Sequence, residues 1–149
     1  MHPINMTNDQ MAFKLMHLCD DMRRREGGDL SSALNPEFYS CNPREMRLTF
    51  AYNVEQWEMN IKNTLHGGIT ASILDTTMGY LVATLIGFHT STINMDTYYC
   101  RPATLGETLL CEAKIDKLGA HIAFVDGTLW VHGNKNKIIA TAKGTYTTG

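Results

Sequence analysis

The stretch LHGGITASILDTTMGYLVATLIGF, residues 65–88, decides how this chain folds. Gly67 and Gly68 precede apolar residues at nearly every position, and Asp75 is the only acid in the run. A membrane span of this length is excluded because an acid near the middle of a lone span is costly. We therefore predict a helix from about residue 67 to residue 88 that is apolar on nearly every side because the rest of the chain wraps it.

The segments around this helix have the composition of strands. Stretches rich in Thr, Val, Ile, Tyr and Phe are predicted to be extended near residues 91–100, 107–118, 121–132 and 137–147. Gly119 and the group Gly133-Asn134-Lys135-Asn136 mark turns, so the last three segments are expected to form an antiparallel meander. Before the helix, apolar side chains alternate with polar ones over residues 46–53, which is the period of a half-buried strand.

An amphipathic helix is predicted near the N-terminus. Thr7 and Gln10 form a capping box at its start. Apolar side chains then recur at helical spacing at Met11, Leu15, Leu18 and Met22. The helix is expected to end at Gly27-Gly28.

One long helix among about five strands, without β-α-β alternation, is typical of an α+β fold in which an antiparallel sheet curls around the helix. A length of 149 residues with 44% hydrophobic residues fits one compact domain over residues 1–149. Residues 1–34 would supply the N-terminal helix and a loop, and residues 35–149 the core.

Composition and charge exclude several classes of function. A formal net charge of -2 argues against nucleic acid as a partner, because phosphate backbones are met by basic surfaces. The four cysteines include no C-x-x-C pair, so a zinc ribbon or redox dithiol is not supported, and we expect buried, reduced thiols. The N-terminus has no basic segment followed by an apolar run, which predicts a cytoplasmic protein without a membrane partner.

His66-Gly67-Gly68 and Asp75 together indicate acyl-transfer chemistry. Glycines at a helix start let a ligand approach the free backbone N–H groups, which can stabilise an oxyanion. Gly67 would donate such an N–H group, with Asn60 upstream as a second donor, and Asp75 would supply the base or nucleophile.

Each of these residues also has a purely structural interpretation. His66 could cap the helix rather than act on protons, and we favour that role. Asn60 could be an ordinary turn residue, the two glycines could serve only close packing, and Asp75 could be a structural acid bonded to a helix end.

The chain resembles hotdog-fold acyl-CoA thioesterases of the PaaI-like (phenylacetic acid degradation) group from about Phe38 onward. The resemblance is carried in order by Asn60, Leu65-His66-Gly67-Gly68, Leu74-Asp75, Met78-Gly79, Arg101-Pro102-Ala103 and Gly106-Glu107. It implies a hotdog fold, an antiparallel sheet wrapped around a long central helix.

The resemblance also implies roles for residues of the site. Gly67 N–H and Asn60 would polarise the thioester carbonyl, and Asp75 would act as general base or nucleophile. A hydroxyl on the next strand would orient water, a role that falls on Thr92 or on Ser91. His66 and Gly68 would contact the substrate beside them.

Basic residues are candidates to meet the phosphates of CoA, namely Arg101, Lys117, Lys135 and Lys137. The basic residue that the family usually carries after the hairpin glycine is replaced here by Ala120-His121. No metal and no cofactor are expected, because the histidines show no ligand spacing and CoA itself belongs to the substrate.

Helix geometry predicts an oligomer. Gly67 and Asp75 are eight residues apart, a rise of about 12 Å, whereas a base and an oxyanion donor must both lie within about 3 Å of the reacting centre. A second subunit could close that gap, and the resemblance implies a homodimer with shared sites and a dimer of dimers as the tetramer.

We therefore predict hydrolysis of a small, medium-chain or aryl acyl-CoA thioester to the free acid and CoA. The alternative is a non-catalytic protein that binds or senses acyl-CoA. Sensors of this fold carry a DNA-binding segment, and the thirty or so residues before the first predicted strand are too few for a helix-turn-helix domain.

Overall fold

The computed structural model describes residues 4–25 and 28–149 and contains three helices and six strands in that part of the chain. The helices are α1 (Asn8–Arg24), α2 (Leu30–Ala33) and α3 (Gly67–Ile86). The strands are β1 (Glu37–Asn42), β2 (Arg47–Asn53), β3 (Thr92–Tyr99), β4 (Thr108–Leu118), β5 (Ile122–Val131) and β6 (Asn134–Thr147). A short 3-10 helix, Gln56–Glu58, lies between β2 and α3.

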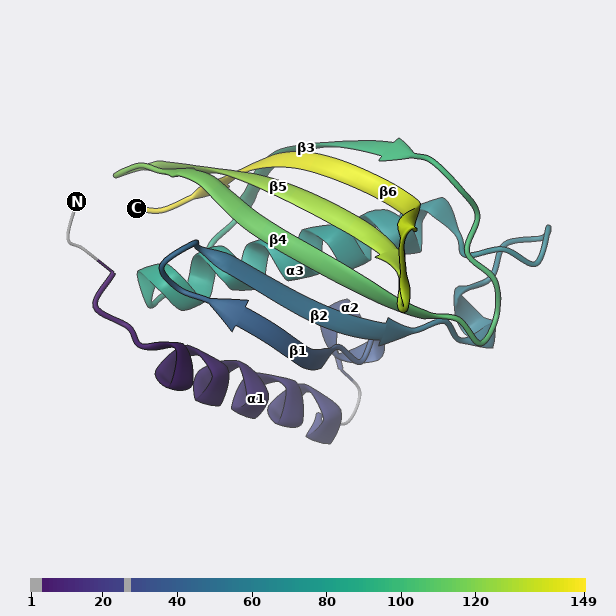
Figure 1. Ribbon diagram of the computed structural model, residues 1–149, viewed down its shortest axis with the longest axis horizontal. Helices are drawn as coiled ribbons and strands as arrows, with labels where there is room; N and C mark the ends of the chain where they lie inside the picture. The colour runs from purple at the N-terminus through teal and green to yellow at the C-terminus, as the bar shows by residue number, and fades with distance from the viewer. Residues whose placement is uncertain (1–3, 26–27) are drawn as a thin grey trace.

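All six strands join one antiparallel sheet in the order β1-β2-β4-β5-β6-β3. The sheet curves over α3, and α1 runs along β1 outside it (Figure 1). β4, β5 and β6 form the predicted meander, whereas β1 and β3 are the two edges of the sheet. The predicted α+β architecture, an antiparallel sheet wrapped around a long helix, is confirmed.

A side-chain cap begins α3, and a left-handed glycine ends it. His66 is its N-cap, and Gly87 ends it in the left-handed conformation with a φ of +83°, a region that favours glycine. The predicted end at residue 88 is therefore two residues too late, because the apolar character of the sequence continues beyond the turn that Gly87 makes.

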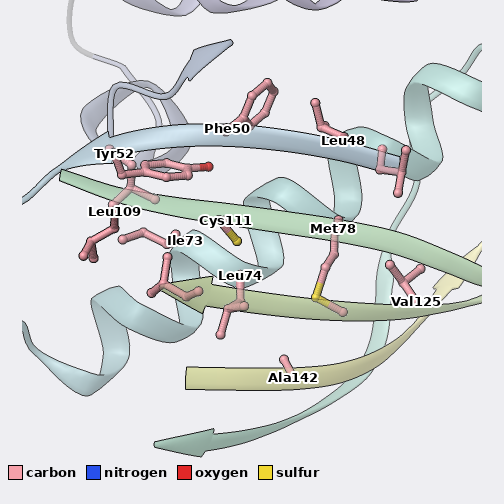
Figure 2. Packing of buried hydrophobic residues seen from close by; sticks show 14 of the residues in the cluster. Leu48, Phe50, Tyr52, Ile73, Leu74, Met78, Leu109, Cys111, Val125 and Ala142 are labelled. Carbon is pink, nitrogen blue, oxygen red and sulfur yellow. The ribbon is translucent and has the colours of Figure 1, made fainter. Parts of the chain in front are cut away.

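One face of α3 packs against the sheet at close range. Figure 2 shows Leu74 and Met78 of α3 with Val125 and Ala142 of the strands in the same core cluster. Gly127 allows this approach, since a Cβ atom there would lie 2.7 Å from Met78 Sδ and 3.1 Å from Leu74 Cδ2. The sheet thus presents small residues where the helix presses on it.

The opposite face of α3 is only partly covered by the chain, contrary to the prediction. The fully buried residues form one stripe at helical spacing: Thr70, Ile73, Leu74, Thr77, Met78, Leu81 and Val82. Ile69, Tyr80 and Leu85 are only partly buried. A helix that is apolar all round but buried on one side needs a further partner surface for the rest.

α3 is long and apolar enough to cross a membrane by length and composition, with a mean hydropathy of 1.4. The core helix of a folded protein meets the same criteria. Because α3 contacts β2, β3, β4, β5 and β6, we interpret it as a core helix.

The N-terminal helix follows its predicted pattern closely. The capping box between Thr7 and Gln10 is present, and Met11, Leu15 and Met22 are buried. Cys19 rather than Leu18 completes the buried stripe, because the helix packs on β1 along a slightly rotated face. The helix ends at Arg24, before the predicted Gly27-Gly28, of which Gly27 lies outside the described residues.

Two elements were absent from the sequence prediction. β1 is an edge strand with little alternation in its side chains, and α2 is a single turn capped by Asp29. β6 also starts earlier than predicted, at Asn134, because the hairpin turns on Gly133 and the polar residues after it already pair with β5. Polar composition alone does not separate such a strand end from a turn.

All four cysteines are free thiols, but only Cys19 and Cys111 are buried. Burial raises the pKa of Cys19 to about 11 and the pKa of Cys111 to about 12. Cys41 is half-buried and Cys100 is exposed, so the expectation that all four are buried was wrong. Cys100 follows directly after the edge strand β3, which explains its exposure.

Leu74→Ala should lower the free energy of unfolding by about 2–5 kcal/mol, because Leu74 is fully buried and the substitution leaves a cavity beneath α3. Urea denaturation at fixed protein concentration measures this loss. Leu105→Ala is the matched control, since Leu105 is 54% exposed and should change the free energy by less than about 0.5 kcal/mol. Equal losses in the two variants would contradict the packing described above.

Candidate active site

Asp75 is held by two hydroxyl groups from two different strands. Thr92 at the start of β3 donates a hydrogen bond from Oγ1 to Asp75 Oδ1 at 2.7 Å. Tyr146 in β6 donates from its hydroxyl to the same oxygen at 2.9 Å. The carboxylate is therefore fixed in orientation although it lies on an apolar helix.

The second carboxylate oxygen of Asp75 is left available. Among the residues that the structure describes, no hydrogen bond is made to Asp75 Oδ2. A cavity of about 210 Å³ opens beside this carboxylate. Its lining comes from α2, α3, β3, β6 and the loop after α3: Ser31, Asp75, Thr76, Gly79, Tyr80, Ala83, His89, Thr90, Thr92 and Tyr146. A carboxylate that lines such a cavity and has an oxygen without a donor can accept a proton from water or attack a carbonyl carbon.

Tyr146 was not found by sequence reasoning. Burial and the negative charge of Asp75 both raise the pKa of Tyr146 well above its ordinary value, so the phenol stays protonated and donates. Tyr146 and Asp75 are 71 positions apart, and the alternation of β6 predicts only that Tyr146 faces inward. No local motif signals the pair.

The start of α3 presents a backbone N–H group. His66 Nδ1 accepts a hydrogen bond from Gly68 N–H at 2.9 Å, and the His66 carbonyl accepts from Thr70 N–H at 3.0 Å. Within the described residues, Gly67 N–H has no acceptor. Because the N-terminal end of a helix carries partial positive charge, Gly67 N–H is suited to an oxyanion. His66 therefore has the helix-capping role that the structural interpretation assigns to it.

Tyr99 lies against the same helix start. Its hydroxyl donates to the Gly67 carbonyl at 2.9 Å, and its ring is 3.4 Å from the position that a Cβ atom of Gly67 would take. Tyr99 is the last residue of β3, whereas Thr92, which contacts Asp75, is the first. β3 therefore runs alongside α3 from the carboxylate to the helix start.

Asn60 forms a turn within its own loop. Its Oδ1 accepts from the N–H groups of Lys62 and Thr64 at 2.9 Å and 3.2 Å, and its Nδ2 donates to Thr64 Oγ1 at 2.9 Å. In the single chain, Asn60 is therefore a turn residue, as its structural interpretation predicts. An amide group has two N–H donors, so one remains for a further acceptor.

Thr92, rather than Ser91, meets Asp75. The backbone N–H of Ser91 donates to Thr147 Oγ1 at 2.9 Å, and its carbonyl accepts from Thr147 N–H at 2.9 Å. Ser91 thus continues the pairing between β3 and β6 instead of facing the carboxylate.

The candidate basic residues are spread over the molecule. Arg101 lines a second cavity of about 270 Å³ near the start of α3, together with Leu65, Thr70, Tyr99, Cys100, Pro102, Ala103 and Ile139. Lys117 is exposed on β4 and lines neither cavity. Lys135 lies over the Trp130 ring at 5.2 Å, and Lys137 pairs with Glu107 at 2.7 Å. Of the four, only Arg101 stands close to the helix start.

No cluster of three or more His, Cys, Asp or Glu side chains that could hold a metal occurs in residues 4–25 and 28–149. The groups gathered around Asp75 and at the start of α3 are a carboxylate, hydroxyl groups and backbone N–H groups. In one chain, however, Asp75 and the start of α3 line two separate cavities.

The sequence of this chain is similar to those of known thioesterases. A sequence model described as the thioesterase superfamily matches residues 62–137, a range that contains Gly67, Asp75 and Thr92. Mouse acyl-coenzyme A thioesterase 13 is 34% identical over 101 residues, which cover 66% of this chain and 71% of that protein.

Solved structures share the architecture over nearly the whole chain. Zebrafish thioesterase superfamily member 2 superimposes with a TM-score of 0.81 at 25% identity, covering 97% of this chain and all of that one. The PaaI protein from the phenylacetic acid degradation operon of Escherichia coli has a TM-score of 0.78 at 19% identity, with 95% of each chain covered, and shows that the fold is shared.

His66→Ala should lower the free energy of unfolding by about 0.5–2 kcal/mol, because Gly68 N–H then loses the cap that Nδ1 provides. His66→Asn should recover most of the loss, since asparagine is among the best N-cap residues. Urea denaturation of both variants checks this. His89→Ala, at an exposed position after α3, serves as control, and a loss there as large as in His66→Ala would contradict the capping role.

Proposed function

This chain belongs to the thioesterase superfamily, and we propose that it hydrolyses small, medium-chain or aryl acyl-CoA thioesters to the free acid and CoA. The observation that carries the proposal is the Asp75 carboxylate beside a cavity: its Oδ1 is bonded to Thr92 and Tyr146, and its Oδ2 accepts no hydrogen bond from the described residues. The similarity to mouse acyl-coenzyme A thioesterase 13 supports acyl-CoA as the substrate class.

The thioester carbonyl would be polarised at the start of α3. Gly67 N–H and the remaining N–H of Asn60 Nδ2 would donate to the carbonyl oxygen and to the oxyanion that forms from it. Donors of this kind, fixed before the reaction, each lower a barrier by about 3–4 kcal/mol. This arrangement supplies the polarisation without a metal ion, so we propose that none is required.

Asp75 would then activate water or attack directly. As a base, Oδ2 takes a proton from water while the hydroxide bonds to the carbonyl carbon, and the C–S bond breaks as that proton passes to the leaving thiolate. As a nucleophile, Oδ2 bonds to the carbonyl carbon, CoA leaves, and water hydrolyses the anhydride. Both routes need the free carboxylate oxygen.

The size of the cavity supports a limited acyl group. Pockets that enclose whole ligands measure about 300–1,000 Å³, whereas the cavity beside Asp75 measures about 210 Å³. It has room for a small or medium acyl chain or an aryl ring next to the carboxylate, with the CoA moiety outside. Arg101, near the start of α3, is the basic side chain best placed to meet a phosphate.

We further propose that two subunits complete each site. β3 pairs with β6 on one side only, and Ile93, Tyr98 and Tyr99 of this edge strand have exposed side chains. An unpaired edge with apolar residues is a template for pairing with another strand. A second copy of the chain would cover both this edge and the partly covered face of α3.

Because the two ends of β3 contact different parts of the site, pairing of two β3 strands would bring those parts together across the subunits. Thr92 marks the end of β3 at Asp75, and Tyr99 marks the end at Gly67. If two β3 strands pair antiparallel about a twofold axis, the Thr92 end of one lies opposite the Tyr99 end of the other. Asp75 of each subunit then approaches Gly67 and Asn60 of its partner, which resolves the separation of about 12 Å within one helix. Association of two such dimers would give the tetramer that the family resemblance implies.

The test is release of CoA from a panel of acetyl-, butyryl-, hexanoyl-, octanoyl-, benzoyl- and phenylacetyl-CoA, followed with a thiol-reactive dye in the presence of a chelator. We expect turnover of at least one substrate, and a loss of about 10²-fold or more in Asp75→Asn, because the base or nucleophile is removed.

Asp126→Asn is the matched acid control, since the Asp126 carboxylate pairs with Lys143 at the surface and lies outside the Asp75 cavity. It should turn over at the wild-type rate. Binding of acyl-CoA without any CoA release would instead favour the non-catalytic alternative, and full activity in Asp75→Asn would refute the mechanism.

A further inference from the structure

We propose that Tyr146 is a positioning residue of the hydrolytic site, which holds Asp75 Oδ1 so that Oδ2 faces water and the thioester. This inference rests on the proposed function and deepens it, because it assigns to β6 a part in catalysis that the motif around Gly67 and Asp75 does not contain. It starts from the convergence of two hydroxyl donors on one carboxylate oxygen.

The two donors differ in how firmly they are held. Thr92 is exposed on the edge strand β3, whereas Tyr146 is 0% exposed in β6, between β3 and β5. A buried tyrosine has one packed ring position, so its hydroxyl is a fixed point for the carboxylate. Thr92 alone would leave the orientation of Asp75 dependent on an edge strand.

Gly144 makes the space for the Tyr146 ring. A Cβ atom on Gly144, two residues before it in β6, would lie 2.9 Å from Tyr146 Cε2, which is too close for any side chain without a shift. On the helix side, the ring lies beside Gly79, one helical turn after Asp75, where a Cβ atom would be at an ordinary contact distance of 3.7 Å from Tyr146 Cε1. The ring therefore packs between β6 and α3 next to Asp75.

Tyr146 holds the carboxylate without exchanging its proton. Burial and the charge of Asp75 raise the pKa of Tyr146, so the phenol stays protonated and remains a donor. Removal of the hydroxyl should therefore leave the carboxylate less well oriented, with Thr92 as its remaining donor.

The chain contains a matched control. Tyr52 in β2 is also a buried tyrosine whose hydroxyl bonds to α3, at 2.9 Å from Thr77 Oγ1. Thr77 donates to the Ile73 carbonyl, so Tyr52 is the donor of the pair, as Tyr146 is at Asp75. Loss of either hydroxyl removes one buried hydrogen bond to the same helix, but only one of them touches the carboxylate.

The experiment compares wild type, Tyr146→Phe and Tyr52→Phe in CoA release from the best substrate of the panel. We expect Tyr146→Phe to lower kcat by about 10- to 100-fold, the factor that corresponds to one hydrogen bond to a charged group, with little change in KM. Tyr52→Phe should stay within about twofold of wild type, because its hydroxyl touches no reacting group.

The split between kcat and KM supplies a readout that a merely structural role would not give. In Tyr146→Phe, the loss should fall on kcat while KM stays within about twofold, since the carboxylate is less well placed but the substrate contacts remain. The neighbouring side chains of the cavity, Tyr80 and His89, are unchanged in both proteins, so the loss of kcat reports the lost hydroxyl.

Unchanged kcat in Tyr146→Phe, while Asp75→Asn is inactive, would overturn this inference and leave the proposed function standing. Equal losses in Tyr146→Phe and Tyr52→Phe would assign Tyr146 a structural role only. If wild type releases no CoA, the proposed function and this inference fail together. If Tyr146→Phe does not fold, Gly144→Ala takes its place, because it keeps the hydroxyl but displaces the ring and must show the same loss of kcat.

Discussion

The rest of the site depends on one acid, Asp75, placed in the middle of an apolar helix. A carboxylate in such surroundings is unfavourable unless hydrogen bonds satisfy it, and two hydroxyls from separate strands do so at one oxygen. For both hydroxyls to reach it, β3 must lie beside β6 and α3 must press closely on the sheet. The small residues Gly127 and Gly144 under the helix are the sequence features that permit this approach.

In the proposed mechanism, the same helix makes the single chain an incomplete catalyst. Its start offers Gly67 N–H, and its middle offers Asp75, but the helix rise keeps the two apart by about 12 Å. The partly covered face of α3 and the free edge of β3 are the surfaces that we propose a second copy covers. Pairing of two β3 strands is therefore the simplest way to satisfy the unpaired edge, the exposed apolar side chains and the chemistry at once.

Sequence reasoning predicted what depends on local pattern. The capping box of α1, the start of α3, the meander of β4, β5 and β6 and the thioesterase family are confirmed by the structure and the comparisons. It missed what depends on distant contacts. Tyr146 reaches Asp75 from 71 residues away, β1 carries little alternation, and the half-covered α3 has the same composition as a fully buried helix. The roles assigned to Gly67, Asn60, Asp75 and Thr92 stay predictions.

The most direct test of the account is complementation between subunits. Asn60→Ala and Asp75→Ala homodimers should each be nearly inactive, whereas unfolding and refolding an equal mixture should restore about a quarter of wild-type activity, because half of the dimers are mixed and each has one intact site of two. Mass spectrometry confirms that mixed dimers form. If activity stays at the level of the separate variants although mixed dimers are present, Asn60 and Asp75 act within one chain and the shared site is wrong.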